Sequence, residues 1–259
     1  MEYVSYPQSF ERLLRILSEL REKCPWDKKQ TIASLRVQTI EELYELTDAI
    51  TEENWPAIKE ELGDLLLHIV FYSRIAAEQN RFSIGNVIED VCNKLVGRHP
   101  HIYDKTVVED ENDVKKNWEQ LKLKEGKKSV LEGIPKALPA MVKGLRLQEK
   151  AKQAGFEWET TEQVADKVYE EWQELQEALS EKSKAAVEEE FGDLLFSLIN
   201  YARFLKIDPE HALEKTNKKF KFRFEQMEVL AAAENKSLQD MNLAEMDALW
   251  DKVKQNTSS

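Results

Sequence analysis

The pattern of apolar and polar positions is helical along most of the chain. Apolar residues recur every three or four positions over 10–21 and 34–50, which is the spacing of one helix face. In the segment 57–79 they occupy nearly all sides, and such a helix normally lies buried between others. Further helical patterns cover 84–96 and 113–124. The sequence therefore predicts an all-α fold.

A segment rich in helix breakers separates the two halves of the chain, KEGKKSVLEGIPKALP (residues 124–139). This segment contains two glycines and two prolines, the residues that most often break helices. We interpret it as a linker between an N-terminal domain, residues 1–123, and a C-terminal domain, residues 140–259.

The two halves of the chain repeat one another. EELYE at 41–45 matches EEWQE at 170–174, and EELGDLLLHIVFYSR at 60–74 matches EEFGDLLFSLINYAR at 189–203. The spacing of 16 residues between Glu45 and Glu61 recurs between Glu174 and Glu190. We therefore expect a tandem duplication of one helical bundle unit.

Composition narrows the classes of fold and function. Eight glycines and seven prolines are too few for the many turns of a sandwich, a barrel or a doubly wound sheet. Acidic residues outnumber basic ones 49 to 37, and the net charge of −12 weighs against a nucleic-acid-binding surface. Small anions remain compatible with this charge where a metal ion or local basic side chains supply positive charge.

Several features indicate a cytoplasmic protein without membrane contact. Cys24 and Cys92 form neither a CxxC motif nor a zinc-binding spacing, as is typical of a reducing compartment. No signal peptide is evident in the first residues. The longest apolar run, 69–72, is far too short to cross a bilayer.

Repeated carboxylates carry the candidate chemistry. Glu171 and Glu174 share one helix face, and Glu190 and Asp193 share a face of the next helix. A lone E-x-x-E is most often a solvated acidic face. Here, however, Glu190 and Asp193 stand among apolar residues, where an unpaired carboxylate is costly. Two such pairs on facing antiparallel helices predict cations between them.

The type of ligand indicates which cation. All four side chains offer hard oxygen atoms, with no His or Cys at a matching position, and this suits Mg²⁺, with Mn²⁺ as a substitute. A di-iron bundle would need Glu-x-x-His on two helices, and that motif is absent from the chain. His68, whose counterpart is Ser197, is interpreted as a packing residue.

Basic and aromatic residues repeat as well. The repeated positions are Lys94, Arg98, Trp118 and Lys122 in the first half and Lys219, Arg223, Trp250 and Lys254 in the second. Taken alone, such residues usually belong to a solvated face or a core. Beside a magnesium site, Lys and Arg would neutralise a triphosphate, and an exposed Trp could stack on a nucleobase. Lys167, one turn before Glu171, is a further candidate for this role.

The motif EExxE, a spacer and ExxD resembles the signature of the all-α nucleoside triphosphate pyrophosphohydrolases. CPWD at 24–27, GRHPHIY at 97–103 and VLEGIPKALPAM at 130–141 make the chain similar to the MazG family over nearly its whole length. The resemblance implies Mg²⁺-dependent hydrolysis of ribo- and deoxyribonucleoside triphosphates, with broad base tolerance, to the monophosphate and pyrophosphate. It also implies a house-cleaning role and a homodimer whose helical units complete one another.

The resemblance also assigns roles to residues. The metal ligands would be Glu171, Glu174, Glu190 and Asp193 in the C-terminal half, and Glu42, Glu45, Glu61 and Asp64 in the N-terminal half. The basic and aromatic residues of the family fall on Lys219, Arg223 and Trp250, and on Lys94, Arg98 and Trp118. Lys167 and Lys254 are added as substrate-binding candidates from their spacing. In MazG-like proteins the C-terminal half is the better supported catalytic unit, although the N-terminal set is complete here.

A bound metal would lower the pKa of a water that attacks phosphorus. Glu170 and Glu189, the first residues of the two EE doublets, are candidates for the general base. Three alternatives remain open. One is a regulatory module that binds a nucleotide or an alarmone without turnover, or engages a partner protein. Another is a structural helical protein with solvated acidic faces, and the third is a hybrid with one catalytic half and one regulatory half.

Overall fold

The computed structural model describes residues 5–104, 129–181 and 183–256, together with residues 110, 114 and 117. These residues are largely helical and include no β-strand, which confirms the predicted all-α class. The chain divides into two compact units, Met1–Trp118 and Glu119–Ser259. The domain boundaries proposed from the sequence stay predictions, since part of the 124–139 segment lies outside the described residues.

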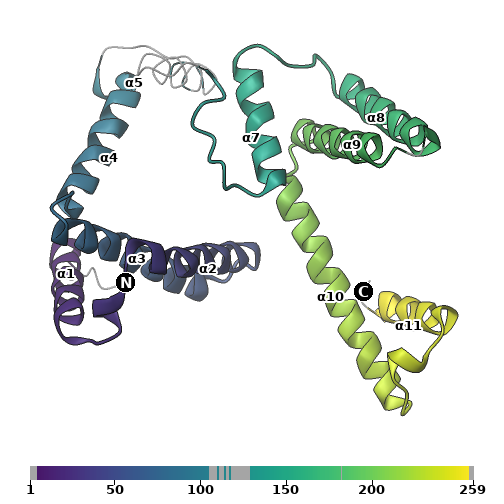
Figure 1. The fold of residues 1–259 in the computed structure, drawn as a ribbon, viewed down its shortest axis with the longest axis horizontal. Helices are drawn as coiled ribbons and strands as arrows, with labels where there is room; N and C mark the ends of the chain where they lie inside the picture. Colours follow the sequence, from purple (N-terminus) through teal and green to yellow (C-terminus); the bar gives the residue numbers. More distant parts are fainter. Residues whose placement is uncertain are drawn as a thin grey trace. The chain divides into compact units, whose positions relative to one another are not determined.

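The N-terminal unit is built around a pair of adjacent helices (Figure 1). Its elements are α1 (Tyr6–Lys23), the 3₁₀ turn η1 (Asp27–Lys29), α2 (Ile32–Thr51), α3 (Trp55–Glu78), α4 (Ile84–Arg98) and α5 (Pro100–Tyr103). Helix α2 packs along α3, and α1 contacts the same α3. Thr31, Asn54 and Ser83 each accept a backbone hydrogen bond at the start of the next helix, which satisfies an otherwise unpaired N–H.

The C-terminal unit repeats this order of helices. Its elements are α7 (Ala140–Gln153), α8 (Thr161–Glu181), α9 (Lys184–Phe204), α10 (Pro209–Ala233), the 3₁₀ turn η2 (Leu238–Asp240) and α11 (Leu243–Asn256). Helices α8 and α9 pair as α2 and α3 do, and α7 packs on α9 (Figure 1). Helix α11 folds back on α10. The helix predicted over 113–124 lies almost entirely outside the described residues.

Each unit has a small apolar core. In the N-terminal unit the buried cluster is formed by Leu17, Leu35, Val70, Phe71 and Ile75. In the C-terminal unit the buried cluster between α10 and α11 is formed by Met227, Ala231, Leu249 and Val253. Full burial of a large apolar side chain stabilises the fold by about 1.5–3 kcal/mol. These clusters therefore fix α1 on the α2–α3 pair and α11 on α10.

The expectation that the helix over 57–79 is buried on nearly all sides is wrong for the single chain. Its repeat, α9, likewise exposes apolar side chains. The exposed fractions are 53% for Leu62, 40% for Leu66, 52% for Phe191 and 44% for Leu195. A pair of helices can cover only the faces that they turn toward each other and toward the helix packed on them. An apolar face of α3 and one of α9 are therefore open to solvent in the described part of the chain, and such faces mark contact surfaces.

Two further findings concern the surroundings of the protein. In the described residues, no helix combines the length and the apolar character needed to span a bilayer. Cys24 and Cys92 are free thiols.

Candidate functional site

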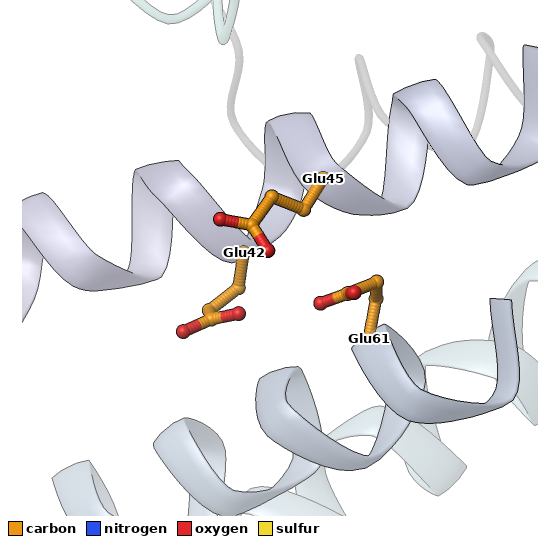
Figure 2. Close-up of side chains that lie close together, drawn as sticks. All are labelled: Glu42, Glu45 and Glu61. Carbon is orange, nitrogen blue, oxygen red and sulfur yellow. The ribbon is translucent and has the colours of Figure 1, made fainter. Parts of the chain in front are cut away.

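Three carboxylates meet between α2 and α3. Glu42 and Glu45 extend from α2, and Glu61 extends from α3 into the space between the two helices (Figure 2). One carboxylate oxygen from each lies within 4.8 Å of the other two. The Oε2 atom of Glu61 is buried and has no hydrogen-bond partner among the described residues. Anionic oxygens at this separation repel one another, so the arrangement favours a cation between them.

The same arrangement recurs between α8 and α9. Glu171 and Glu174 from α8 and Glu190 from α9 each offer an oxygen within 4.8 Å of the others. Glu171 is buried, Glu190 is partly buried and Glu174 is exposed. The two clusters match because the sequence spacing is the same in both halves. The two glutamates of the first helix are three residues apart, and 16 residues separate the second of them from the glutamate of the next helix.

The two aspartates of the predicted ligand sets lie beside these clusters. Asp64 and Asp193 are not among the oxygens grouped within 4.8 Å. Their charges nevertheless raise the pKa of Glu42 and of Glu190, respectively. The structure thus groups three of the four predicted ligands in each half and leaves each aspartate within electrostatic reach.

Two carboxylates in each cluster hold their protons more strongly than usual. The pKa values of Glu42, Glu61, Glu174 and Glu190 all lie above the ordinary value. Loss of hydration is the largest cause for each, and the charge of a neighbouring acid is the next. A divalent cation would remove the repulsion. The all-oxygen donor set of each cluster, and in the N-terminal cluster the unpartnered buried oxygen of Glu61, therefore fit Mg²⁺ or Mn²⁺.

Lys167 distinguishes the C-terminal cluster from the N-terminal one. Its Nζ lies 2.8 Å from Oε1 of Glu170 and 2.8 Å from Oε1 of Glu171. The hydrogen bonds to Glu170 and Glu171 raise the pKa of Lys167, so the ammonium stays charged. The equivalent residue on α2 is Gln38, which is neutral. The C-terminal cluster therefore combines a cation site with a fixed positive charge.

The two general-base candidates are both exposed. Glu170 is held by its ion pair with Lys167, and Glu189 lies next to Glu190 on α9. Neither belongs to a carboxylate group within 4.8 Å. Their role in proton transfer stays a prediction.

A cleft of about 630 Å³ opens beside the C-terminal cluster. It is lined by residues of α7, α8 and α9 and of the turn that follows α7. Three charged residues at or beside the carboxylate cluster also line the cleft: Lys167, Glu171 and Asp193. Its aromatic lining residues are Phe156, Trp158 and Phe196. The cleft therefore joins a charged end to an aromatic interior, which is typical of a site for an amphipathic small molecule.

An ion pair holds the turn that carries the aromatic residues. Gly155 has a φ of 90°, a left-handed conformation that glycine adopts without strain. Arg203 of α9 donates to both carboxylate oxygens of Glu157, at 2.7 and 2.6 Å. Burial raises the pKa of Glu157. The hydrogen bonds and positive charges of Arg203 and Lys152 lower it by more than burial raises it, so the net pKa lies below the ordinary value. The turn is thus fastened to α9 at the edge of the cleft.

The predicted basic and aromatic residues on α10 and α11 lie outside this cleft. The guanidinium carbon of Arg223 is 5.8 Å from the ring centroid of Trp250, and Phe220 is 5.4 Å from Trp250 between centroids. Lys219 and Lys254 are exposed. None of the four predicted residues on α10 and α11 is among the lining residues of the cleft.

The corresponding N-terminal residues are placed only in part. Lys94 and Arg98 lie on α4, and Trp118 is outside the described residues. The substrate-binding roles assigned to these residues and to their counterparts on α10 and α11 therefore stay predictions.

Several cleft residues were missed from the sequence. GFEW at 155–158 corresponds only roughly to CPWD at 24–27, and this weak match does not reveal that its aromatic residues line a cleft. Gln148 belongs to no motif, and Asn200 and Arg203 lie in the repeated segment 189–203, which does not mark them as cleft residues. The repeat offered one usable signal, because Ser197 and Asn200 stand where the first half has the larger His68 and Phe71.

Comparison with known proteins identifies the family of the chain. The family model described as the MazG nucleotide pyrophosphohydrolase domain matches the chain twice, at residues 30–103 and 159–228. The chain is 44% identical over 250 residues to the nucleoside triphosphate pyrophosphohydrolase/pyrophosphatase MazG of Thermotoga maritima, covering 95% of each chain. It is 40% identical over 256 residues to the nucleoside triphosphate pyrophosphohydrolase of Escherichia coli K12, covering 94% of this chain and 96% of that one. The double match confirms the tandem duplication, and the chain belongs to the MazG nucleotide pyrophosphohydrolase family.

Proposed function

We propose that this protein hydrolyses nucleoside triphosphates to the monophosphate and pyrophosphate, and so acts as a house-cleaning enzyme of the nucleotide pool. The observation that carries the proposal is the junction of a carboxylate cluster with a cleft through Glu171. The relatives named nucleoside triphosphate pyrophosphohydrolase support the same activity. We extend the proposal to ribo- and deoxyribonucleotides with any base.

In this proposal Glu171, Glu174 and Glu190 hold Mg²⁺. When bound there, the ion supplies charge for the phosphate oxygens and makes a coordinated water more acidic. Lys167 donates a hydrogen bond to a phosphate oxygen once the substrate competes with Glu170 and Glu171 for it. Glu170 or Glu189 then accepts the proton of the attacking water.

We propose the C-terminal half as the catalytic unit. The cluster of Glu42, Glu45 and Glu61 has the same donor atoms and is proposed as a second Mg²⁺ site. It has neutral Gln38 at the position of Lys167, so it lacks the cationic partner for a phosphate that α8 provides. Cation binding without turnover is therefore the function that we propose for the N-terminal cluster.

The first test is an assay with the whole chain and each common NTP and dNTP, with and without Mg²⁺. We expect pyrophosphate and the nucleoside monophosphate as products, and release only when Mg²⁺ is present. Pyrophosphate and orthophosphate are quantified separately, because orthophosphate as the main product would indicate cleavage at the terminal phosphate. If nucleotide binds and neither product forms, the protein is a regulatory nucleotide-binding module and not an enzyme.

We further propose that the protein is a homodimer, formed through the exposed apolar faces of α3 and α9. Phe191 is 52% exposed and Leu62 is 53% exposed, and burying such side chains against a second copy would be favourable. Light scattering is expected to give twice the chain mass of 30.2 kDa across a dilution series. A Phe191→Glu variant should shift this equilibrium toward the monomer. A wild-type mass that is monomeric at every concentration would contradict the proposal.

We place the activity in the cytoplasm and propose no nucleic-acid partner. The free thiols of Cys24 and Cys92 support a reducing compartment. The net charge of −12 argues against a polyanionic partner.

A further inference from the structure

We propose that Lys150 is a positioning residue for nucleotide binding: it fixes the segment before α7 so that Leu131 of that segment forms part of the wall of the cleft. This segment, residues 129–139, is the strap. The proposal rests on the proposed function, because it concerns the binding of the same substrate. Three observations support it: a pair of lysine contacts along α7, a buried ammonium group, and a strap residue that lines the cleft.

The strap runs antiparallel to α7 and is attached to it at two points. The Nζ of Lys150 donates to the backbone oxygen of Val130 at 3.0 Å, and the Nζ of Lys143 donates to the backbone oxygen of Lys136 at 2.8 Å. The later lysine of the helix thus binds the earlier part of the strap. Lys143 and Lys150 are seven residues apart, which is about two turns, so both lie on one face of α7.

The attachment through Lys150 is the firmer of the two. Lys150 is 6% exposed, and an ammonium group is costly to remove from water unless it forms hydrogen bonds. A hydrogen bond from a charged donor is roughly twice as strong as one between neutral groups. The bond of Lys143, by contrast, is exposed to solvent, which weakens it. Lys150 therefore fixes the beginning of the strap.

A compact turn transmits this attachment to Leu131. The backbone N–H of Leu131 donates to Oγ of Ser129 at 3.2 Å, and that of Glu132 donates to the backbone oxygen of Ser129 at 3.1 Å. Gly133 follows with a φ of 88°, a left-handed conformation that favours glycine. Val130 lies inside this turn, so the bond that its carbonyl accepts also sets the position of its neighbour.

Leu131 is the strap residue that reaches the cleft. It lines the cleft together with Leu147 and Ala151, which belong to α7. Leu131 is 42% exposed, so its apolar surface is accessible to a ligand. Contact with a bound nucleotide would remove this surface from water, which favours binding. An apolar side chain has no charge or proton to offer, so its effect falls on binding and not on the chemical step.

Another part of α7 is fixed on α9, which carries Glu190 of the carboxylate cluster. A Cβ atom at Gly144 would lie 3.1 Å from Cδ1 of Ile199, so the two helices approach closely there. The Nε2 of Gln148 donates to the backbone oxygen of Phe196 at 2.7 Å. Through α7, Lys150 thus connects the strap to the same frame that holds the proposed metal ligands.

The first repeat does not bury a lysine at the corresponding position. GFEW at 155–158 corresponds roughly to CPWD at 24–27, and by this match Lys150 corresponds to Glu19. The side chain of Glu19 is 56% exposed and lies 3.9 Å from Nζ of Lys23 on the same helix. An ordinary solvated position of the first repeat is therefore a buried attachment point in the second, the unit with the cleft and with Lys167.

The test measures nucleotide binding by the whole chain in the presence of Mg²⁺. Calorimetry with the α,β-imido analogue of ATP gives the affinity, and kcat is measured for pyrophosphate release from ATP. Leu131→Ala and Lys150→Met are each expected to weaken binding about fivefold and to keep kcat within about twofold. Lys215→Met, the same change at an exposed position of α10, should alter neither quantity.

A double variant separates positioning from an independent effect. If Lys150 acts by holding Leu131, Lys150→Met already displaces that side chain, and adding Leu131→Ala should weaken binding by no more than about twofold further. Independent effects would multiply to about twenty-fivefold. Lys150→Arg keeps a charged donor and should bind within about twofold of wild type.

Hydrogen exchange shows where Lys150→Met acts. Amides of residues 129–134 are expected to exchange faster in this variant, while those of α8 and α9 keep the wild-type rates. This pattern would show that the fold of the unit is intact and that only the strap is released.

The possible results separate the proposal from the function on which it rests. Unchanged binding by Leu131→Ala would overturn the strap as a wall of the cleft, whether or not Lys150→Met folds. Multiplied effects in the double variant, unchanged exchange in the strap, or faster exchange throughout α8 and α9 would overturn the role of Lys150. The expected binding and exchange results without pyrophosphate release from ATP would contradict only the proposed hydrolysis.

Discussion

Replacement of Glu190 by Gln is expected to lower the rate of pyrophosphate release at saturating Mg²⁺ by about a hundredfold or more. Glu190 is the carboxylate that α9 contributes to the cluster, so its loss leaves only the two from α8. The amide keeps the size of the side chain but removes its negative charge. The measurement is kcat for pyrophosphate release over a range of Mg²⁺ concentrations, which separates weaker metal binding from slower chemistry.

The chain offers matched controls for this variant. Glu188→Gln makes the same change at an exposed position of the same helix, outside the carboxylate group, and should keep kcat within about twofold of wild type. Glu174→Ala and Glu45→Ala compare equivalent positions in the two halves. Loss of activity in Glu174→Ala alone would support the C-terminal unit as the catalytic one. Full activity of Glu190→Gln at saturating Mg²⁺ would show that the metal site is wrongly assigned.

Mg²⁺ is expected to raise the melting temperature by roughly 3–6 °C at pH 7 and to have little effect near pH 4. Without metal, the raised pKa values of Glu42, Glu61, Glu174 and Glu190 mean that the folded state binds these protons more tightly than the unfolded chain. Their contribution to stability is therefore present below the ordinary value of 4.5 and is lost as the pH rises through the raised values. Mg²⁺ binds the ionised carboxylates and removes this loss.

The measurement is a set of melting curves followed by circular dichroism between pH 4 and pH 8, with and without Mg²⁺. In the metal-free protein, the stability contributed by these carboxylates should fall as the pH rises. The increase in melting temperature caused by Mg²⁺ should grow over the same pH range. A combined Glu61→Gln and Glu190→Gln variant should show a smaller increase at pH 7. An equal effect of Mg²⁺ at pH 4 and pH 7 would contradict coupling between metal binding and these carboxylates.

Local spacing was enough to predict the helices and the carboxylate clusters. The periods over 10–21, 34–50, 57–79 and 84–96 correspond to α1 to α4, because a helix needs only neighbouring residues to form its hydrogen bonds. Glu171 and Glu174 share a face by their spacing alone. The sequence separation from Glu174 to Glu190 equals that from Glu45 to Glu61. In each repeat it brings one carboxylate of the next helix close to the first two.

Which surfaces stay open was decided only by the tertiary structure. Helical periodicity shows that a face is apolar but not whether another helix covers it, which is why the exposure of Leu62 and Phe191 was not foreseen. In the same way, the basic and aromatic repeats predicted Arg223 and Trp250 as a substrate site. The structure adds that the Arg223 guanidinium lies over the Trp250 ring where α10 meets α11, and their role in substrate binding stays a prediction.

The carboxylate clusters followed from the sequence because i, i+3 spacing and a repeated distance are local properties, read in the same way in both halves. The cleft did not, because an open volume depends on the sizes of side chains that three helices bring together from distant positions. Ser197 and Asn200 leave that volume open, whereas His68 and Phe71 fill the equivalent positions. Gln148, which belongs to no motif, becomes a lining residue of this cleft through the hydrogen bond from its Nε2 to the backbone oxygen of Phe196.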